Sequence, residues 1–245
     1  MKKKEDLKNH SNIKDTSINP ALLHLFQIHD SAFPTGGYAH SFGMETYIQE
    51  NTIGNKDELW SFCNTYIEHN LASTDAIIVK EAYELAKKRD MEGLVHLEGI
   101  CHSLKLSPES RKGSMMMGRQ FLQTVSTLND DDLLIFYNEK IKNKEMKGHF
   151  PVAYGIYTSI LEVNMRLSIE TFLYSSVATL VQNAVRAVPL GQMGGVETLY
   201  RLLPVIQKAT KKIMGLGLDD LANHSIALEI ASMKHEYLHS RLFIS

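Results

Sequence analysis

Cysteine is scarce in this sequence: Cys63 and Cys101 are the only two among 245 residues. Two cysteines so far apart exclude a disulfide framework and a zinc site built from several cysteines. This composition fits a reducing compartment best, so we expect a cytoplasmic protein.

Long apolar runs are also missing. The longest uncharged stretch, Thr171–Val185, contains serine, threonine, glutamine and asparagine, and it is shorter than a membrane span. The opening MKKKEDLKNH is basic, but no apolar segment follows it, so it does not have the form of a signal peptide. We therefore expect no membrane association.

The sequence has no large excess of either charge, with a formal net charge of −2 at pH 7. A general nucleic-acid partner or an anionic membrane surface therefore gains no support. A hydrophobic fraction of 44% with 22% charged residues is ordinary for a globular protein, and a chain of this length can bury a large core.

Alternating strand patterns, hairpin turns and internal repeats are absent too. After Pro20 the apolar residues recur at helical spacing. We predict an all-α protein, with a flexible polar tail at residues 1–18 and a single compact domain of about ten helices over residues 19–245. The domain would end in a C-terminal interaction tail.

Helix starts are predicted where a capping residue, a proline or an acidic first turn precedes an apolar pattern. We expect Pro189 to end a buried helix, residues 191–195 to form a loose connection, and the last helix to run from Asp219–Asp220 toward Tyr237. The predicted starts lie near His40, Asn55, Thr74, Asp90, Ser107, Asn129, Pro151, Ser168 and Asp219.

The most informative run is DSAFPTGGYAHSFGMETYI, residues 30–48. Pro34 biases the residue before it toward an extended conformation, so a first helix should stop near His29. Gly36 and Gly37 allow a sharp reversal. We expect Gly37 to hold a backbone conformation that a Cβ would strain, and His40 to project from the surface of the reversal.

The segment His235-Glu236-Tyr237-Leu238-His239 is a literal H-E-x-x-H on a predicted helix. In zinc peptidases this spacing places two imidazoles on one helix face, with the glutamate as general base. A third ligand is required, and none of residues 240–245 is His, Asp, Glu or Cys. A zinc metallopeptidase built on His235, Glu236 and His239 is therefore an alternative rather than our main interpretation.

Other signals for chemistry are weak. The run GSMMMGR at residues 113–119 lacks the Lys-Ser/Thr of a phosphate-binding loop and follows a helix start instead of a strand. The eleven histidines are scattered at spacings that do not bring several onto one face. We assign no catalytic, cofactor-binding or metal-binding residue.

The run at residues 30–48 closely resembles the N-terminal signature of the UreF family of urease accessory proteins. That signature has Asp-Ser-x-Phe-Pro-x-Gly followed by His-Ser-Phe-Gly and a Glu-Thr or Glu-Ala pair. Three further segments match in family order, and the resemblance spans roughly residues 20 to 245: PESRKGSMMMGR (108–119), QNAVRAVPLGQMGG (182–195) and HSRLFIS (239–245).

The resemblance implies a non-enzymatic scaffold for urease maturation. Such proteins join UreD, called UreH in some organisms, and recruit and regulate the GTPase UreG. The complex forms on apo-urease, where GTP hydrolysis is coupled to nickel insertion. No cofactor would be bound stably, nickel would be handled by the complex, and a homodimer could form within it. A helical regulatory protein unrelated to urease is the other alternative.

The matching motifs also suggest two partner-binding surfaces. The ending from Arg241 to Ser245 is apolar apart from one arginine, so it either folds back into the core or docks into a partner. Candidates for the GTPase-facing or self-association surface are Gly36, Gly37, His40, Ser41 and Gly43. Candidates for the UreD/UreH-facing side are Arg186, Pro189, Leu190, Gly191, Gln192, Arg241, Leu242 and Phe243.

Overall fold

The computed structural model describes residues 20–245, so the tail predicted at residues 1–18 lies outside the described residues. Every regular element within the described range is helical, which confirms the all-α single domain. The α-helices are α1 (Pro20–His29), α2 (Met44–Gln49), α3 (Lys56–Thr65), α4 (Asp75–Lys87), α5 (Met91–Leu104), α6 (Pro108–Val125), α7 (Asp132–Lys142), α8 (Phe150–Ile160), α9 (Met165–Ala187), α10 (Gly191–Ile213) and α11 (Ile226–His235). Short turns complete the fold: the 3-10 helices η1 (Gly37–Ala39), η3 (Leu71–Ser73) and η4 (Leu218–Asp220), and the π-helical η2 (Tyr66–Asn70).

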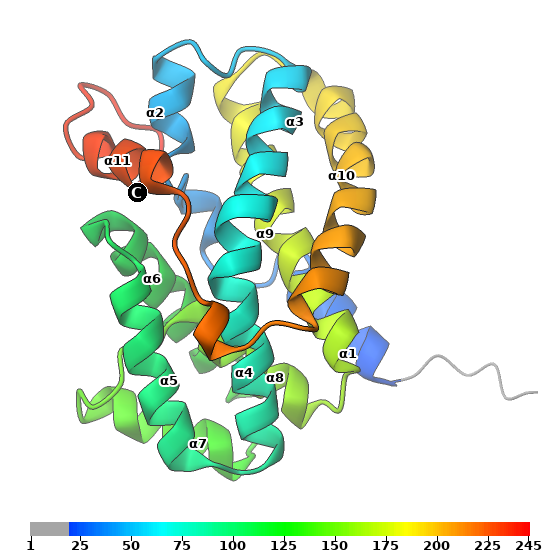
Figure 1. Ribbon diagram of the computed structural model, residues 1–245, viewed down its shortest axis with the longest axis vertical. Helices are drawn as coiled ribbons and strands as arrows, with labels where there is room; N and C mark the ends of the chain where they lie inside the picture. Colours follow the sequence, from blue (N-terminus) through cyan, green and yellow to red (C-terminus); the bar gives the residue numbers. More distant parts are fainter. Residues whose placement is uncertain (1–19) are drawn as a thin grey trace, which may run out of the picture.

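Helix α4 lies at the centre of the domain and contacts α5, α8 and α9 (Figure 1). Three consecutive residues of α4, Ile77 to Val79, are fully buried, so the helix has no solvent face at this point. Gly155 of α8 lies where an added Cβ would be 2.5 Å from the carbonyl oxygen of Val79. The two backbones therefore meet directly, which only glycine permits here.

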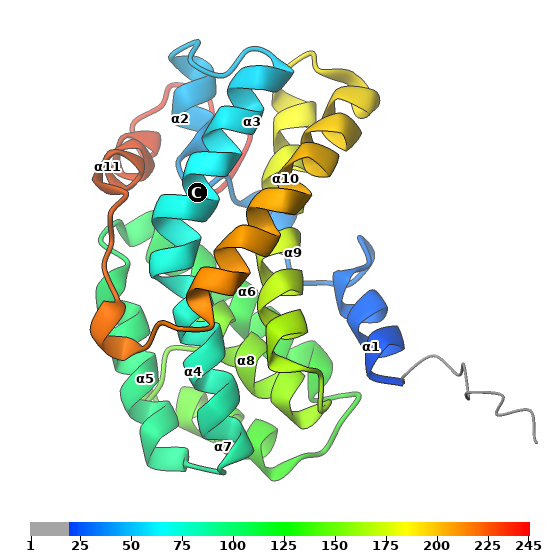
Figure 2. The same cartoon turned by 45° about the vertical axis from the view of Figure 1, so that its right-hand side comes forward.

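Helices α10 and α11 lie on the outside of this arrangement, on different sides of the domain (Figures 1 and 2). Helix α10 packs on α3 and α9, and α11 packs on α2 and α6. No helix in residues 20–245 combines the length and the apolar character needed to cross a membrane.

Several predicted helix starts are confirmed by their caps. The Asn55 side chain accepts hydrogen bonds from the amides of Asp57 and Glu58, and the Asp90 side chain accepts one from Gly93. The Ser107 hydroxyl caps α6, whose first residue is a proline. These side chains satisfy amides that have no partner within the helix.

The second helix begins at Met44, not near His40. Phe42 and Gly43 both have positive φ, which is incompatible with a continuous right-handed helix. The chain therefore makes only the short turn η1 before α2 begins.

Three further boundaries were wrong. Helix α9 begins at Met165, not at Ser168, because the Asn164 side chain caps it. Residues 191–195 form the first turn of α10, not a loose connection; a Cβ on Gly195 would lie 2.8 Å from Val185, so this glycine serves close packing on α9. The two aspartates of the last predicted start form only η4, and α11 runs from Ile226 to His235.

A buried carboxylate anchors the loop that leads into α8. Glu98 of α5 accepts hydrogen bonds from the Tyr137 hydroxyl (2.6 Å) and from the amides of Gly148 (2.6 Å) and His149 (3.0 Å). Burial raises the pKa of Glu98, and these donors oppose the rise. The loop is thus fixed by one acidic side chain from a different helix.

Burial lowers the pKa of His149 to about 2, and its ring hydrogen-bonds to Ser114 and His102, both at 3.0 Å. The ring is neutral in the folded state but gains a proton below pH 6.5 when the chain unfolds. Its contribution is therefore fully present above pH 6.5 and is lost as the pH falls. We expect His149→Asn to reduce the loss of unfolding free energy between pH 6.5 and 4.5, by up to about 1.4 kcal/mol per pH unit.

Urea titrations at several pH values measure this, with the exposed His224 changed to Asn as the control. Parallel pH profiles for the wild type and the His149 variant would contradict the assignment.

Helix α6 passes directly against the loop before α8. An added Cβ on Gly118 would lie 2.2 Å from the carbonyl oxygen of Gly148 and 2.5 Å from the amide nitrogen of Phe150. We expect Gly118→Ala to lower the free energy of unfolding by about 1–3 kcal/mol, as overpacking does.

The matched control is Gly99→Ala in α5, where an added Cβ meets nothing within 4 Å. That change should raise the free energy of unfolding by up to about 1 kcal/mol, because alanine has a higher helix propensity than glycine. Denaturant unfolding followed by circular dichroism compares the two, and equal effects would refute the close approach.

Candidate functional site

The four motif-bearing segments meet at one place in the structure, which we call the junction. It comprises the N-terminal turn (residues 36–45), the start of α6, the end of α9 and the terminal strap (residues 239–245). Gly113 of α6 lies in contact with it: an added Cβ there would be 3.0 Å from the Ser245 hydroxyl and 3.2 Å from His40 Nδ1. Residues from both ends of the described chain are therefore packed on one helix.

The terminal strap folds back onto the N-terminal turn. The amide of Ile244 donates to the carbonyl of Ala39 at 2.8 Å, and the amides of Ser41 and Phe42 donate to the main-chain oxygen of Ser245. His40 Nδ1 and the Ser245 hydroxyl share a hydrogen bond of 2.7 Å. Of the two possibilities for this ending, folding back is the one observed.

The end of α9 holds the turn and the strap together. The Asn183 side chain donates to the carbonyl of His40 at 2.9 Å, and Arg186 donates to the carbonyl of Tyr38 at 2.9 Å. The Arg186 guanidinium also lies 5.4 Å from the centre of the Phe243 ring, which is a cation–π distance. Phe243 itself is buried, with 3% of its surface exposed.

Glu45, in the first turn of α2, is the most connected side chain of the junction. It is buried and accepts hydrogen bonds from the amides of Leu242 (2.6 Å) and Phe243 (3.2 Å) and from His235 Nε2 (2.7 Å). One carboxylate thus fixes both the strap and the end of α11.

Glu109, in the first turn of α6, contacts the other side of the same imidazole. His235 Nδ1 lies 2.8 Å from its carboxylate, and Arg241 lies 3.3 Å from it. The imidazole of His235 thus links the carboxylates of α2 and α6 to the end of α11.

This geometry excludes the zinc peptidase. Both ring nitrogens of His235 are engaged by carboxylates, α11 ends at His235, and His239 is exposed beyond the helix. The two histidines therefore do not share a helix face. Within residues 20–245 no group of three His, Cys, Asp or Glu side chains is arranged to hold a metal ion.

The residues predicted to face the GTPase or a second copy are mostly buried. Gly37, His40, Ser41 and Gly43 are buried, and only Gly36 is partly exposed. His40 does not project from the surface as expected: 1% of it is exposed, and burial, with a smaller effect of Lys112, lowers its pKa. These residues form the buried side of the turn.

The exposed residue of this turn is Tyr38, with 70% of its surface accessible. The expectation for Gly37 also needs correction, because the positive φ of +78° belongs to Gly36. A Cβ on Gly37 would instead meet Thr179 at 3.1 Å and Met117 at 3.3 Å. At Gly37 the constraint is therefore close packing against two side chains and not a positive φ.

The residues predicted to face UreD/UreH fall into two groups. Arg186, Arg241 and Leu242 are exposed at the junction, whereas Phe243 is buried in it. Four others lie at the connection into α10, where Leu190 is partly buried and Pro189, Gly191 and Gln192 are exposed. The candidate residues of the strap therefore pack against the N-terminal turn. The two predicted surfaces thus both rest on the junction.

An exposed apolar face continues the junction onto α11. Large apolar side chains recur at helical spacing along α11 and just beyond its end, and the strap exposes two more apolar side chains. The exposed residues are Ile226 (63%), Ile230 (48%), Met233 (40%), Tyr237 (81%), Leu242 (51%) and Ile244 (52%). We call these six residues the α11–strap face.

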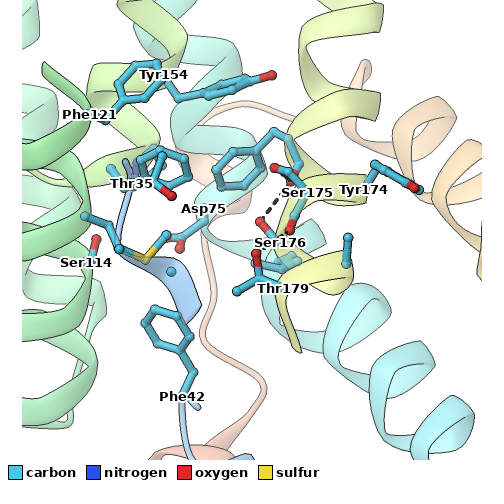
Figure 3. A pocket seen from close by; sticks show the side chains of 18 of the residues that line it. Thr35, Phe42, Asp75, Ser114, Phe121, Tyr154, Tyr174, Ser175, Ser176 and Thr179 are labelled. Atoms are coloured by element: carbon cyan, nitrogen blue, oxygen red, sulfur yellow. Dashed lines mark hydrogen bonds between the residues drawn. The ribbon is translucent and has the colours of Figure 1, made fainter. Parts of the chain in front are cut away.

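A cavity of about 430 Å³ is lined partly by the N-terminal turn (Figure 3). Figure 3 shows Ser176 and Thr179 of α9 on one side and Ser114 of α6 on the other. The two α9 hydroxyls donate to carbonyls of their own helix, and Asp75 is paired with Lys105 at 2.7 Å. Because these two hydroxyls already donate within α9, they can only accept hydrogen bonds from a group in the cavity. The cavity otherwise offers packing contacts.

Sequence reasoning missed the roles of Glu45, Glu109 and Asn183. In the sequence, the two glutamates looked only like favourable acidic residues in the first turn of a helix. Their partners lie more than a hundred positions away in the chain, and local patterns carry no such information. Their only signal is that each lies inside one of the family-like motifs.

Comparison with known proteins gives a consistent result. The family model described as UreF matches residues 53–203. The chain is 65% identical over 202 residues to the urease accessory protein UreF of Sporosarcina pasteurii, covering 82% of this chain and all of that protein. It is 37% identical to the UreF of Bacillus sp. (strain TB-90) and 36% identical to that of Lachnoclostridium phytofermentans; each match covers 91% of this chain and at least 98% of the relative.

The central position of Glu45 leads to a direct test. We expect Glu45→Ala to lower the free energy of unfolding by about 3–5 kcal/mol, because it leaves a buried imidazole and two amides without their acceptor. It should also make the terminal strap more sensitive to proteolysis. Chemical denaturation and timed digestion measure these effects.

The control is Glu50→Ala, which removes an exposed ion pair with Lys234. It should change the free energy of unfolding by less than about 1 kcal/mol. If both variants retained wild-type stability and strap protection, Glu45 would not hold the junction.

Proposed function

The chain belongs to the UreF family of urease accessory proteins, and on that premise we propose that it is a non-enzymatic scaffold in urease maturation. It joins UreD/UreH, recruits and regulates the GTPase UreG, and supports nickel insertion into apo-urease. It acts in the cytoplasm, with a homodimer forming within the complex. Nickel is handled by the complex as cargo, and no cofactor is bound stably by this chain.

The observation that carries this proposal is the junction. A buried network of polar side chains fixes the strap, the turn and α11 in one arrangement. The hydrogen bonds of this network hold surface segments in a defined shape. A binding surface requires such a fixed shape. A scaffold acts through surfaces of this kind.

We place UreD/UreH on the α11–strap face. A face with this much exposed apolar surface on a folded protein is typical of a protein interaction site. Arg241 lies at its edge and is already oriented by Glu109. Tyrosine and arginine are the residue types that most often dominate binding energy at interfaces, so Tyr237 and Arg241 are the expected anchors.

We place UreG or the second copy of this chain on the turn side, around Tyr38. The buried residues Gly37, His40, Ser41 and Gly43 shape this surface without touching the partner. Arg186 contributes from the end of α9, since it holds the Tyr38 carbonyl. This assignment keeps a partner surface at the turn but replaces its buried residues as contact residues. It also moves Arg186 there from the predicted UreD/UreH side and leaves residues 189–192 out of that side.

The alternative of a helical regulator unrelated to urease loses its support, because the family assignment covers most of the chain. The peptidase alternative fails on the geometry of His235 and His239.

We expect Tyr237→Asp and Leu242→Asp each to weaken binding to UreD/UreH at least tenfold, because a charge would be buried among apolar contacts. Both side chains are exposed, so the helical fold should be unchanged by circular dichroism. Co-purification and titration with UreD/UreH measure the effect.

The control is Leu128→Asp, a similarly exposed leucine after α6, which should bind like the wild type. If the two face variants are folded and still bind UreD/UreH fully, the assignment of this face is wrong.

A further inference from the structure

Helix α10 has a second apolar face that nothing in the described part of the chain covers. The inner face packs on the core through residues such as Leu202 and Ile206. The outer face carries four exposed apolar side chains at helical spacing: Met193 (69%), Val196 (59%), Tyr200 (75%) and Leu203 (39%). In Figure 1 α10 lies along the right-hand side of the upper part of the domain, and in Figure 2 it lies toward the viewer.

The four apolar side chains form a ridge along α10, and polar residues continue it toward the end of the helix. At 3.6 residues per turn the four side chains lie on one side of α10 and extend over about 15 Å. Gln207 and Lys211 follow on the same side at the i+4 spacing. The face therefore changes from apolar to cationic toward the end of the helix.

The charges around the ridge show what it lacks. Glu197, the only acidic residue of α10, is already paired with Lys56 at 2.6 Å. Arg201 is paired with Asp57 at 2.6 Å, and Lys208 is paired with Glu68 at 2.9 Å. Among the described residues, Lys211 has no recorded acidic partner.

A second copy of this chain does not complement the face. In an antiparallel two-fold pair, Lys211 of one copy would face the positive N-terminal end of α10 in the other. In a parallel pair, Lys211 would face Lys211. Both arrangements bring like charges together, so the occupant has to supply an acidic group of its own.

We propose that the outer face of α10 is a docking site for an amphipathic helix of a different protein. The docked helix carries an apolar ridge with residues at i, i+4 and i+7, which packs on Val196, Tyr200 and Leu203. One end of it carries an acidic side chain that pairs with Lys211. This surface is separate from the α11–strap face, so a scaffold of the proposed kind would hold two partners at once.

The test uses a synthetic 18-residue helical peptide with leucines at i, i+4, i+7 and i+11 and two glutamates at one end. We expect the wild-type chain to bind it, and Tyr200→Asp and Lys211→Glu each to weaken binding at least tenfold. A control peptide with lysines in place of the glutamates should bind at least tenfold more weakly. Ile135→Asp, at an exposed position of α7 (49%), should bind like the wild type.

The same variants are then titrated with UreD/UreH, UreG and apo-urease, and loss of any one of them identifies the natural partner. Unchanged binding of the peptide and of all three proteins would overturn the proposal. A wild-type dimer that Tyr200→Asp dissociates, seen by sedimentation, would also overturn it, because the occupant would then be a second copy. Failure of the proposed function would give a different result, because the wild type itself would then bind none of the three proteins. In that case the peptide titration alone would decide whether α10 is a docking site.

Discussion

The arrangement of this protein around its candidate site depends on one buried carboxylate, that of Glu45. A buried carboxylate is costly unless donors surround it, and here the donors come from His235 and from two amides of the terminal strap. Because none of these donors belongs to α2, folding of the N-terminal turn is tied to folding of the chain's other end. The helix dipole adds a favourable contribution, since Glu45 lies in the first turn of α2.

That constraint changes the meaning of the motifs. Residues that looked like two separate surfaces are layers of one structure, with Asn183 and Arg186 between the turn and the strap. The buried layer, which includes His40 and Phe243, has exact polar and packing requirements. The exposed layer, which includes Tyr38 and Leu242, has few contacts within the chain. In this chain the motifs therefore identify the buried support of the surface more directly than its exposed residues.

Local chemistry in the sequence was sufficient for much of the fold. The caps Asn55, Asp90 and Ser107 were found because a capping side chain acts within three residues. The loose connection at residues 191–195 was wrong because the same glycine pattern serves either a turn or a close helix contact, and only tertiary packing separates them. The central role of Glu45 was out of reach for the same reason, since its partners are distant in the chain.

The two outward apolar faces differ in how they are held. Leu242 and Ile244 of the α11–strap face lie on a strap held by hydrogen bonds, so their positions depend on the network around Glu45 and Glu109. The face of α10 belongs to a helix of 23 residues packed on α3 and α9, and it keeps its shape without the strap. A rigid ridge suits a preformed helix, because little conformational entropy is lost on docking. The strap face suits a partner that recognises an extended segment, with apolar side chains presented at alternate positions, Leu242 and Ile244.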